Sequence, residues 1–323
     1  MPSDIETLNN LVEKYQQLRS EIAKVIIGQE DAVESLLVSV FTGGHCLLVG
    51  VPGLAKTLLV NTLSKALGLS FSRIQFTPDL MPSDITGSEI LDENRKFRFV
   101  KGPVFANILL ADEINRTPPK TQSALLEAMQ EKYVTVSGHS YPLDAPFFVL
   151  ATQNPIEQEG TYPLPEAQLD RFMFNIKMDY PSFDEEINIV KQTTVDTNST
   201  PQVVLSADEI LAFQSAIRRM PVPDNVVSYA VGLVSATRPD KEGNDLARKY
   251  LSWGAGPRAS QYLVMGAKTK AAFSGKYSPD CEDVDAVATE VLRHRLVLNY
   301  FAEAEGVSTD AVIVELKKKV RSL

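Results

Sequence analysis

The chain has 323 residues, of which 44% are hydrophobic and 23% are charged. This is the composition of an ordinary globular protein, and the length allows two domains with a core of useful size. It excludes a wholly disordered chain, a collagen-like repeat and a small disulfide-stapled protein. Lysine and arginine number 32 against 41 aspartates and glutamates, which gives a net charge of −9. So acidic a chain is not expected to bind nucleic acid or anionic lipid over a broad surface.

Three features concern the compartment in which the chain works. Apolar runs such as Phe147–Ala151 are far shorter than the ~20 residues that span a bilayer, so no membrane span is expected. The polar, acidic start of the chain, Met1–Asn10, does not have the pattern of a signal peptide. Cys46 and Cys281 lie far apart in the sequence, and we expect both to stay reduced in a cytoplasmic protein.

Residues 1–180 predict an α/β domain. The short apolar runs Cys46–Val49, Ile108–Ala111 and Phe147–Thr152 have the length and composition of buried parallel strands. Between the last two runs, Thr121–Glu131 has apolar residues at helical spacing. Strand, helix and strand in this order indicate a parallel sheet between layers of helices.

Residues 181–323 predict a second, all-helical domain. The polar stretch Thr193–Pro201 is expected to be a loop, and Val203–Leu205 is the single candidate strand in this half. Helical spacing covers six segments: Asp184–Thr193, Ser206–Arg219, Asp224–Thr237, Ser260–Ser274, Asp283–Val297 and Asp310–Val320.

A phosphate-binding loop is predicted directly after the first strand. The sequence GVPGLAKT, residues 50–57, joins that strand to a helix, and its backbone N–H groups can surround phosphate oxygens at the helix N-terminus. Lys56 is expected to reach the β- and γ-phosphates of a nucleotide, and the Thr57 hydroxyl to ligate Mg²⁺. Ala55 stands where the last glycine is usual, and we expect its backbone to stay helical and binding to be retained. The alternative is a chance glycine-rich turn before a helix.

Two carboxylates end the second predicted strand. Functional groups gather at the carboxyl ends of parallel strands, so Asp112 is expected to hold Mg²⁺ through a water and Glu113 to orient or deprotonate the attacking water. The alternative is that the chain simply returns to solvent there. Asn154 ends the third strand and is expected to hydrogen-bond the attacking water and a γ-phosphate oxygen. Its other role, turn formation before Pro155, is compatible with this.

Two arginines have alternative interpretations. Arg171 follows the short helical segment Pro165–Leu169 and can form a surface salt bridge, or it can reach the nucleotide of a neighbouring subunit, where one arginine strongly accelerates phosphoryl transfer. Arg258 is predicted in the first turn of a helix, where the helix dipole disfavours a cation. This favours an anionic partner such as a phosphate over an ordinary solvent-facing arginine.

Six segments together resemble the AAA+ ATPases and, within them, the MoxR family, over nearly the whole chain. In chain order they are VIIGQE (25–30), GVPGLAKT (50–57), LLADEINR (109–116), ATQNP (151–155), LPEAQLDRF (164–172) and GPRAS (256–260). The resemblance implies a P-loop NTPase (AAA+) core with a C-terminal helical lid, and ATP and Mg²⁺ as cofactors. It makes Asn154 the first sensor, Arg171 the arginine finger and Arg258 the second sensor. The residues then expected at the nucleotide are Ile27, Gly28, Gly50, Val51, Pro52, Gly53, Leu54, Ala55, Lys56, Thr57 and Leu58, with Thr57 and Asp112 at the metal.

Two insertions match those of the MoxR clade. Leu80–Val104 has a hairpin-like turn at Asp92-Glu93-Asn94, followed by basic residues up to Lys101, and Tyr133–Pro146 alternates as a hairpin with Ser137-Gly138 at its tip. The resemblance implies that both face the central pore of a ring. It also makes Gln75 a polar switch residue facing Glu113. Arg116 either acts with Arg171 or pairs with an acidic neighbour, and Arg171 is the favoured finger.

The function implied by the resemblance is ATP hydrolysis in a hexameric homo-oligomeric ring. Its work would be chaperone-like remodelling or maturation of partner complexes, in some cases with insertion of a metal cofactor, and a protein with a von Willebrand factor A domain is the implied partner. The alternatives are a nucleotide-gated scaffold that signals by ATP occupancy, and a DNA-remodelling motor, which only the basic hairpin Arg95–Lys101 favours. A metal enzyme is disfavoured because His45, His139 and His294 form no ligand motif. His45 is expected to pack beside the phosphate-loop strand.

Overall fold

The computed structural model describes residues 3–91, 93, 95–157, 159–194, 199–241 and 244–321. Two parts of the sequence-based predictions lie outside these ranges. They are Asp92 and Asn94 in the turn of the first predicted hairpin, and residues 195–198 of the predicted loop Thr193–Pro201. None of the helices within the described ranges is long and apolar enough to cross a membrane.

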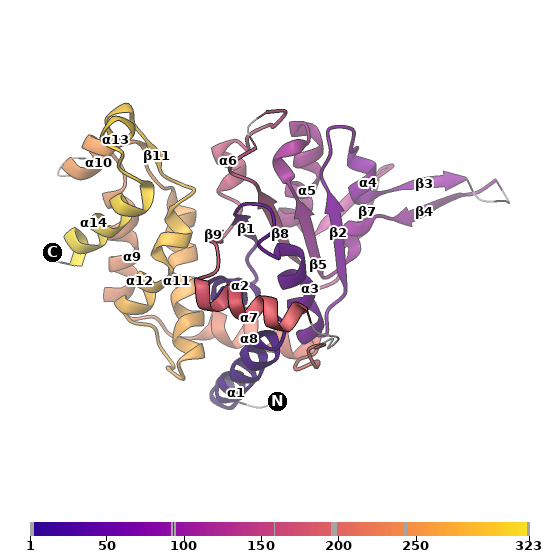
Figure 1. Cartoon of the computed structure of the whole chain (residues 1–323), viewed down its shortest axis with the longest axis horizontal. Coiled ribbons are helices and arrows are strands. Elements are labelled where there is room, and N and C mark those ends of the chain that lie inside the picture. Colours follow the sequence, from indigo (N-terminus) through magenta and orange to yellow (C-terminus); the bar gives the residue numbers. More distant parts are fainter. Residues whose placement is uncertain are drawn as a thin grey trace.

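A five-stranded parallel sheet forms the centre of the first half of the chain (Figure 1), as predicted. Its strand order is β2-β5-β8-β1-β9, with bounds β1 Cys46–Val49, β2 Phe71–Gln75, β5 Ile108–Asp112, β8 Phe148–Gln153 and β9 Phe174–Lys177. The three strands expected from apolar runs are β1, β5 and β8, and they are neighbours at the middle of the sheet. Their carboxyl ends therefore meet at one edge.

Alternate residues of the central strands face two different hydrophobic cores. In β1, Cys46 and Leu48 belong to a core shared with helices α1 (Asp4–Ala23), α2 (Glu30–Thr42) and α3 (Lys56–Ala66). Leu47 points the other way, into the core beneath α5 (Pro119–Glu131). Both faces of the sheet are thus covered by helices, which is why these strands read as continuous apolar runs.

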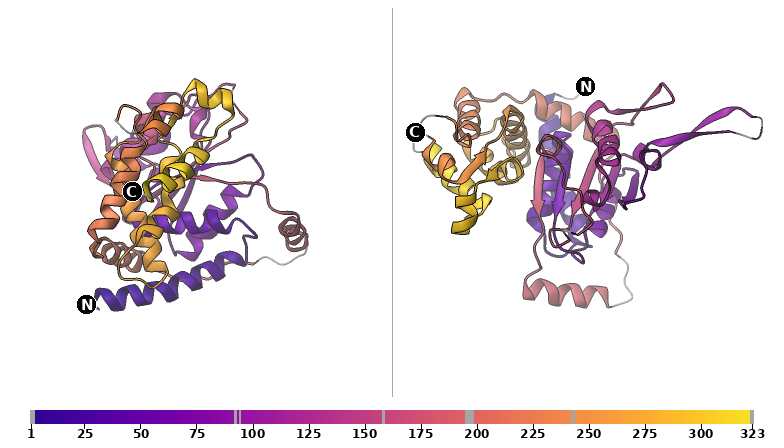
Figure 2. Two further views of the ribbon diagram at one scale, coloured as in Figure 1. Left: turned by 90° about the vertical axis from the view of Figure 1, so that its left-hand side faces the viewer. Right: turned by 90° about the horizontal axis from the view of Figure 1, so that it is seen from above.

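Both predicted hairpins are present. After α4 (Pro82–Thr86), β3 (Gly87–Leu91) pairs antiparallel with β4 (Phe97–Lys101), and this ribbon projects beyond the rest of the chain (Figure 2). The second hairpin pairs β6 (Tyr133–Val136) with β7 (His139–Pro142). The rings of Phe99 and Tyr141 stack with centroids 3.9 Å apart, so the two hairpins pack against each other. Two 3₁₀ turns, η1 (Pro103–Phe105) and η2 (Ile114–Arg116), flank β5.

The second half of the chain is helical, as predicted. Its helices are α7 (Phe183–Thr193), α8 (Ala207–Arg219), α9 (Asp224–Ala236), α10 (Asp245–Tyr250), α11 (Pro257–Phe273), α12 (Cys281–Leu292), α13 (Tyr300–Glu305) and α14 (Thr309–Arg321). The short helix α6 (Glu166–Leu169) belongs to the first half and precedes β9. Helices α8 and α11 pack against α1 and α2, so residues from both halves contribute to one of the cores. Helix α7 has no buried residue and lies outside the main body in Figure 2.

Two details of the helical half differ from the prediction. Val203–Leu205 is not a strand: Val204 donates one backbone hydrogen bond to the carbonyl of Ala66, and no ladder follows. A small antiparallel sheet instead pairs β10 (Leu251–Trp253) with β11 (Val297–Leu298), and the helix predicted to reach Val297 ends at Leu292. Strands of two or three residues have too short a pattern to be recognised in sequence.

Candidate functional site

The phosphate-loop segment lies between β1 and α3, as the sequence predicts. The Lys56 ammonium lies over the loop and donates a hydrogen bond to the Gly50 carbonyl. Burial lowers the pKa of Lys56, and the nearby charges of Asp112 and Glu113 act in the opposite direction. Gly53 has a φ of +89° and is open to solvent, which leaves backbone N–H groups of the loop accessible to a ligand.

The expectation for Ala55 is wrong in one respect. Its φ of +54° is left-handed rather than helical, and α3 begins only at Lys56. A residue with a Cβ pays roughly 1–2 kcal/mol for this conformation, which glycine adopts freely. The strain has a physical reason, because the loop must turn sharply to bring Lys56 back over the Gly50 carbonyl.

A pocket of about 170 Å³ opens beside the loop. Among the residues predicted to bind the nucleotide, Ile27, Gly53, Leu54, Ala55 and Leu58 line it. Its remaining lining residues are Val25, Ile26, Gln29, Leu59, Met178, Pro181, Ile189, Gln192 and Thr193. The last three come from α7, a contribution that sequence reasoning missed because the apolar spacing of that helix gives no indication of what it covers. Most of the lining is aliphatic, which suits the flat faces of a base.

Other predicted loop residues lie around this pocket without lining it. Gly28 is left-handed, with a φ of +69°, and a Cβ there would meet the Glu185 carboxylate at 2.6 Å. Gly50 is held close to the Met178 backbone, since a Cβ would lie 2.9 Å from that carbonyl. Val51 packs against the core, while Pro52 is exposed at the outer turn of the loop.

Asp112 lies at the sheet edge in a dense polar network. Its Oδ2 accepts hydrogen bonds from Nε and an Nη of Arg73 at 3.1 and 2.6 Å, and its Oδ1 accepts from the Thr152 hydroxyl at 2.6 Å. The carboxylate charge is thus balanced by a cation in this arrangement. Asp112 and the Thr57 hydroxyl at the start of α3 are oxygen ligands of the kind Mg²⁺ prefers, so these residues fit a magnesium ion. Arg73 and Thr152 are the members of this group that the sequence did not suggest.

Glu113 occupies a strained backbone position with a φ of +57°. Its N–H donates to the Thr152 hydroxyl at 2.8 Å, which ties the strained turn to β8. The side-chain amide of Gln75 donates to Glu113 Oε2 at 2.8 Å, and the predicted contact between these residues is confirmed. Arg116 donates to the same oxygen at 3.0 Å. Of the two alternatives for Arg116, pairing with an acidic neighbour is the one present here.

Asn154 follows β8, directly after the residue that pairs with Val49 of the phosphate-loop strand. Its side chain is buried and its Oδ1 accepts from the Ile156 N–H at 3.2 Å, the turn chemistry expected of it. The sheet register therefore places it next to the phosphate loop. Lys56, Asp112, Glu113 and Asn154 all lie at the carboxyl edge formed by β1, β5 and β8.

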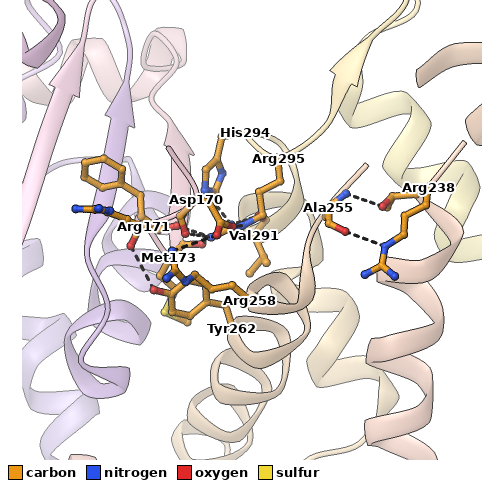
Figure 3. Close-up of polar contacts among 12 residues, drawn as sticks. Asp170, Arg171, Met173, Arg238, Ala255, Arg258, Tyr262, Val291, His294 and Arg295 are labelled. Atoms are coloured by element: carbon orange, nitrogen blue, oxygen red, sulfur yellow. Dashed lines mark hydrogen bonds and ion pairs between the residues drawn. The ribbon is translucent and has the colours of Figure 1, made fainter. Parts of the chain in front are cut away.

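Arg171 does not line the pocket beside the phosphate loop. Its guanidinium donates to the Leu126 carbonyl at 2.7 Å and borders a separate surface cavity between α5 and α6, with Glu127 and Gln168. Arg258 is half-buried and pairs with Asp170 at 3.1 Å (Figure 3). It does not line the pocket either. The structure thus brings one group of predicted residues together and leaves these two arginines apart from it.

The comparisons with known proteins agree with this fold. The model of the "ATPase family associated with various cellular activities (AAA)" matches residues 45–174, and the model of the "AAA lid domain" matches residues 244–316. Chaperone MoxR1 from Mycobacterium tuberculosis is 46% identical over 314 residues, which are 97% of this chain and 83% of that protein. Protein MoxR from Methylorubrum extorquens is 31% identical over 298 residues, 86% of each chain.

A solved structure extends this agreement to three dimensions. A Cytophaga hutchinsonii protein, proposed to be an ATPase, has a TM-score of 0.91 at 46% identity, covering 97% of this chain and 96% of its own. The fold places the chain in the AAA+ class of ATPases. The chain belongs to the MoxR family of these ATPases.

Proposed function

We propose that this protein hydrolyses ATP to ADP and phosphate in a hexameric ring, and that it uses the resulting motion for chaperone-like remodelling of partner complexes. The observation that carries the proposal is the gathering of Lys56, Asp112, Glu113 and Asn154 at one edge of the parallel sheet, beside a pocket lined by the phosphate loop. The name of one relative, Chaperone MoxR1, supports the chaperone part.

Each residue at this edge has a separate task in the proposed reaction. The Lys56 ammonium exchanges the Gly50 carbonyl for phosphate oxygens, which are better partners because they carry charge. Glu113 accepts the proton of the attacking water, and the Asn154 amide orients that water against the γ-phosphate. Thr57 and Asp112 would hold Mg²⁺, which when bound neutralises charge on the phosphates. Arg73 must then share or release Asp112, since both cations need the same carboxylate.

Arg171 is proposed to act on the ATP of a neighbouring subunit. Its position outside the pocket of its own subunit supports this, and one hydrogen bond to a backbone carbonyl is a modest cost for releasing its guanidinium. Arg258 is proposed to sense the nucleotide from the helical region. Residues 1–180 then form the nucleotide-binding domain and 181–323 the lid that moves against it.

The two hairpins are proposed to contact the partner at the pore of the ring. Ile90, Leu91 and Phe97 on the β3–β4 ribbon are exposed, together with basic side chains such as Arg98 and Lys101. Such a surface suits an acidic, partly apolar protein segment. A protein with a von Willebrand factor A domain is the proposed partner, and maturation of a metal-containing complex is one form the work could take. Both cysteines are free, which supports a reducing, cytoplasmic setting.

The test is ATP hydrolysis measured over a series of protein dilutions, with molar mass followed by light scattering. We expect turnover per subunit to rise as a ring-sized species appears, because each site needs Arg171 from a neighbour. Turnover that is the same for monomers and rings would contradict action across subunits. A mixing experiment sharpens this: Arg171→Ala subunits should bind ATP but hydrolyse it poorly, and added Glu113→Gln subunits should restore turnover by lending their intact Arg171.

A second candidate is a scaffold that signals by ATP occupancy without turnover. The observation that favours it is the convergence of Gln75 and Arg116 on Glu113 Oε2, which occupies the oxygen that would accept the water proton. ATP binding with no phosphate release at any protein concentration would support this candidate and contradict the first.

A further inference from the structure

The segment Asp170–Met173, which carries Arg171, is held by one buried arginine of the C-terminal region (Figure 3). The Arg295 guanidinium donates to Asp170 Oδ1 at 2.8 Å and to the backbone carbonyls of Asp170 and Phe172 at 2.9 and 2.7 Å. It also donates to the carbonyls of Met173, at 3.3 Å, and Val291. Every nitrogen of this side chain thus has a partner, and most of the partners belong to this one segment.

Arg295 is unusual in its burial. Its side chain is 2% exposed, and its guanidinium lies 5.2 Å from the centre of the Tyr262 ring. Burying a charged side chain costs several kcal/mol unless it is paired and hydrogen-bonded, so its bonds to the Asp170–Met173 segment are required for it to be there at all. The segment and Arg295 are therefore fixed relative to each other.

The Arg171 side chain is not part of this cluster, although its backbone is. The Tyr262 hydroxyl donates to the Arg171 carbonyl at 3.2 Å, while the Arg171 guanidinium points away from the cluster (Figure 3). The guanidinium donates instead to the Leu126 carbonyl. Residues of the helical half thus hold the backbone at and around Arg171, while the Arg171 guanidinium remains at the surface. Such an arrangement fixes the direction of the Arg171 side chain and leaves its guanidinium available for another partner.

Asp170 connects the cluster to a second arginine. Its Oδ1 faces Arg295, and its Oδ2 accepts from Arg258 of α11 at 3.1 Å. Arg258 donates to Asp170 through one of its guanidinium nitrogens, so a phosphate that draws the guanidinium away would leave Asp170 to Arg295 alone. The position of Arg258 is in this way linked to the segment that carries Arg171.

We propose that Arg295 is a positioning residue for Arg171: it fixes the Asp170–Met173 segment so that Arg171 is presented to the neighbouring subunit, and through the shared Asp170 it links that presentation to Arg258. This inference rests on the proposed function, in which Arg171 completes the site of a neighbour. It assigns Arg295 no contact with nucleotide in its own subunit.

The test is to replace Arg295→Lys, which keeps the charge but cannot supply the same fork of donors. We expect ATP binding to be unchanged and turnover to fall at least about tenfold, the scale on which misplacing a group by a fraction of an ångström acts. Adding Glu113→Gln subunits should restore turnover, because they present a correctly held Arg171 to sites that keep Glu113. Conversely, subunits with both Glu113→Gln and Arg295→Lys should fail to restore Arg171→Ala subunits.

Arg293→Lys is the matched control. Arg293 follows the same helix and is largely buried, but its hydrogen-bond partners, Asp310 and the Asn175 carbonyl of β9, lie outside the Asp170–Met173 segment. Subunits with Glu113→Gln and Arg293→Lys should restore Arg171→Ala subunits normally. Equal loss in both lysine variants would show a general loss of packing and would overturn the proposal.

A second variant covers the case in which Arg295→Lys does not fold. Asp170→Asn keeps the size of the side chain and removes the charge that both arginines share, and we expect the same failure to lend Arg171. The proposal would be overturned if subunits with Glu113→Gln and Asp170→Asn restored the turnover of Arg171→Ala subunits normally. It would also be overturned if Glu113→Gln subunits did not restore the turnover of Asp170→Asn subunits. The proposed function fails separately, if Glu113→Gln subunits do not restore Arg171→Ala subunits in rings with wild-type Arg295.

Discussion

The side-chain amide of Gln75, at the end of β2, donates a 2.8 Å hydrogen bond to Oε2 of Glu113, which follows the neighbouring strand β5. Arg116 donates to the same oxygen from three residues further along. Glu113 is thus held in place by two donors at the oxygen that would take a proton from water. In this arrangement the Glu113 carboxylate is held in place, but its Oε2 is occupied by these two hydrogen bonds.

Replacing Gln75→Met removes one of these donors and keeps the length of the side chain. We expect basal ATP turnover to rise by roughly two- to tenfold, because the loss of one hydrogen bond of about 1 kcal/mol frees Glu113 more often. Phosphate release at fixed protein concentration measures this. The Glu113→Gln variant is the reference, with ATP binding retained and turnover lower by orders of magnitude. A fall in turnover for Gln75→Met would mean that Gln75 assists Glu113 rather than restrains it.

Replacing Lys56→Ala removes the ammonium that lies over the phosphate loop. We expect ATP affinity to fall by roughly ten- to a hundredfold, because a hydrogen bond to a charged group contributes about 1.5–3 kcal/mol. Isothermal titration with ATP measures the loss. Lys65→Ala is the control, since Lys65 is exposed on the last turn of the same helix and should bind ATP normally. Equal ATP affinity in the two variants would contradict the assignment of Lys56 to phosphate binding.

Replacing Ala55→Gly tests the left-handed backbone at the end of the loop. We expect the free energy of unfolding to stay level or to rise by up to about 1 kcal/mol, since relief of strain exceeds the added entropy of glycine in the unfolded chain. Chemical denaturation measures it. Ala311→Gly, at an exposed position inside the right-handed helix α14, should instead lose about 1 kcal/mol. The same loss in both variants would show that Ala55 is not strained.

The buried His45 predicts a specific loss of stability in acid. The Val149 N–H donates to its Nδ1 at 3.0 Å, so the ring proton is on Nε2, which lies 3.2 Å from the Met129 carbonyl and 3.1 Å from the Lys132 ammonium. Burial, reinforced by Lys132, lowers the pKa of His45 well below 6.5. The unfolded chain therefore binds a proton below pH 6.5 that the folded protein does not. Stability is full above pH 6.5 and decreases as the pH falls.

For this one proton, the free energy of unfolding is expected to fall by about 1.4 kcal/mol for each pH unit below 6.5. Burial also lowers the pKa of His294, so the wild-type slope contains a second such contribution. In His45→Asn, denaturation between pH 6.5 and 5 should show a shallower loss than in the wild type, whatever the stability at pH 8. Parallel profiles for the two proteins would refute the assignment to His45.

Local patterns in the sequence determined the centre of this protein. The strands β1, β5 and β8 were predictable because their apolar runs are short, continuous and bounded by polar residues, and buried parallel strands require this. Lys56, Asp112, Glu113 and Asn154 were predictable for a related reason. Asp112 ends such a strand, Glu113 and Asn154 directly follow one, and Lys56 begins the helix after the loop that leaves β1. Parallel strands bring their carboxyl ends to one edge whatever the rest of the fold does.

Only the tertiary structure decided how distant parts of the chain meet at that centre. Three examples are the ion pair of Arg73 with Asp112, the position of α7 beside the phosphate-loop pocket and the pairing of β10 with β11. No local repeat in the sequence predicts these contacts. The left-handed Ala55 likewise depends on closing the loop over Gly50. Arg295 illustrates the reason most directly: a charged residue at the end of a helix reads as solvent-facing, and it is buried here because Asp170, 125 positions earlier, supplies the opposite charge.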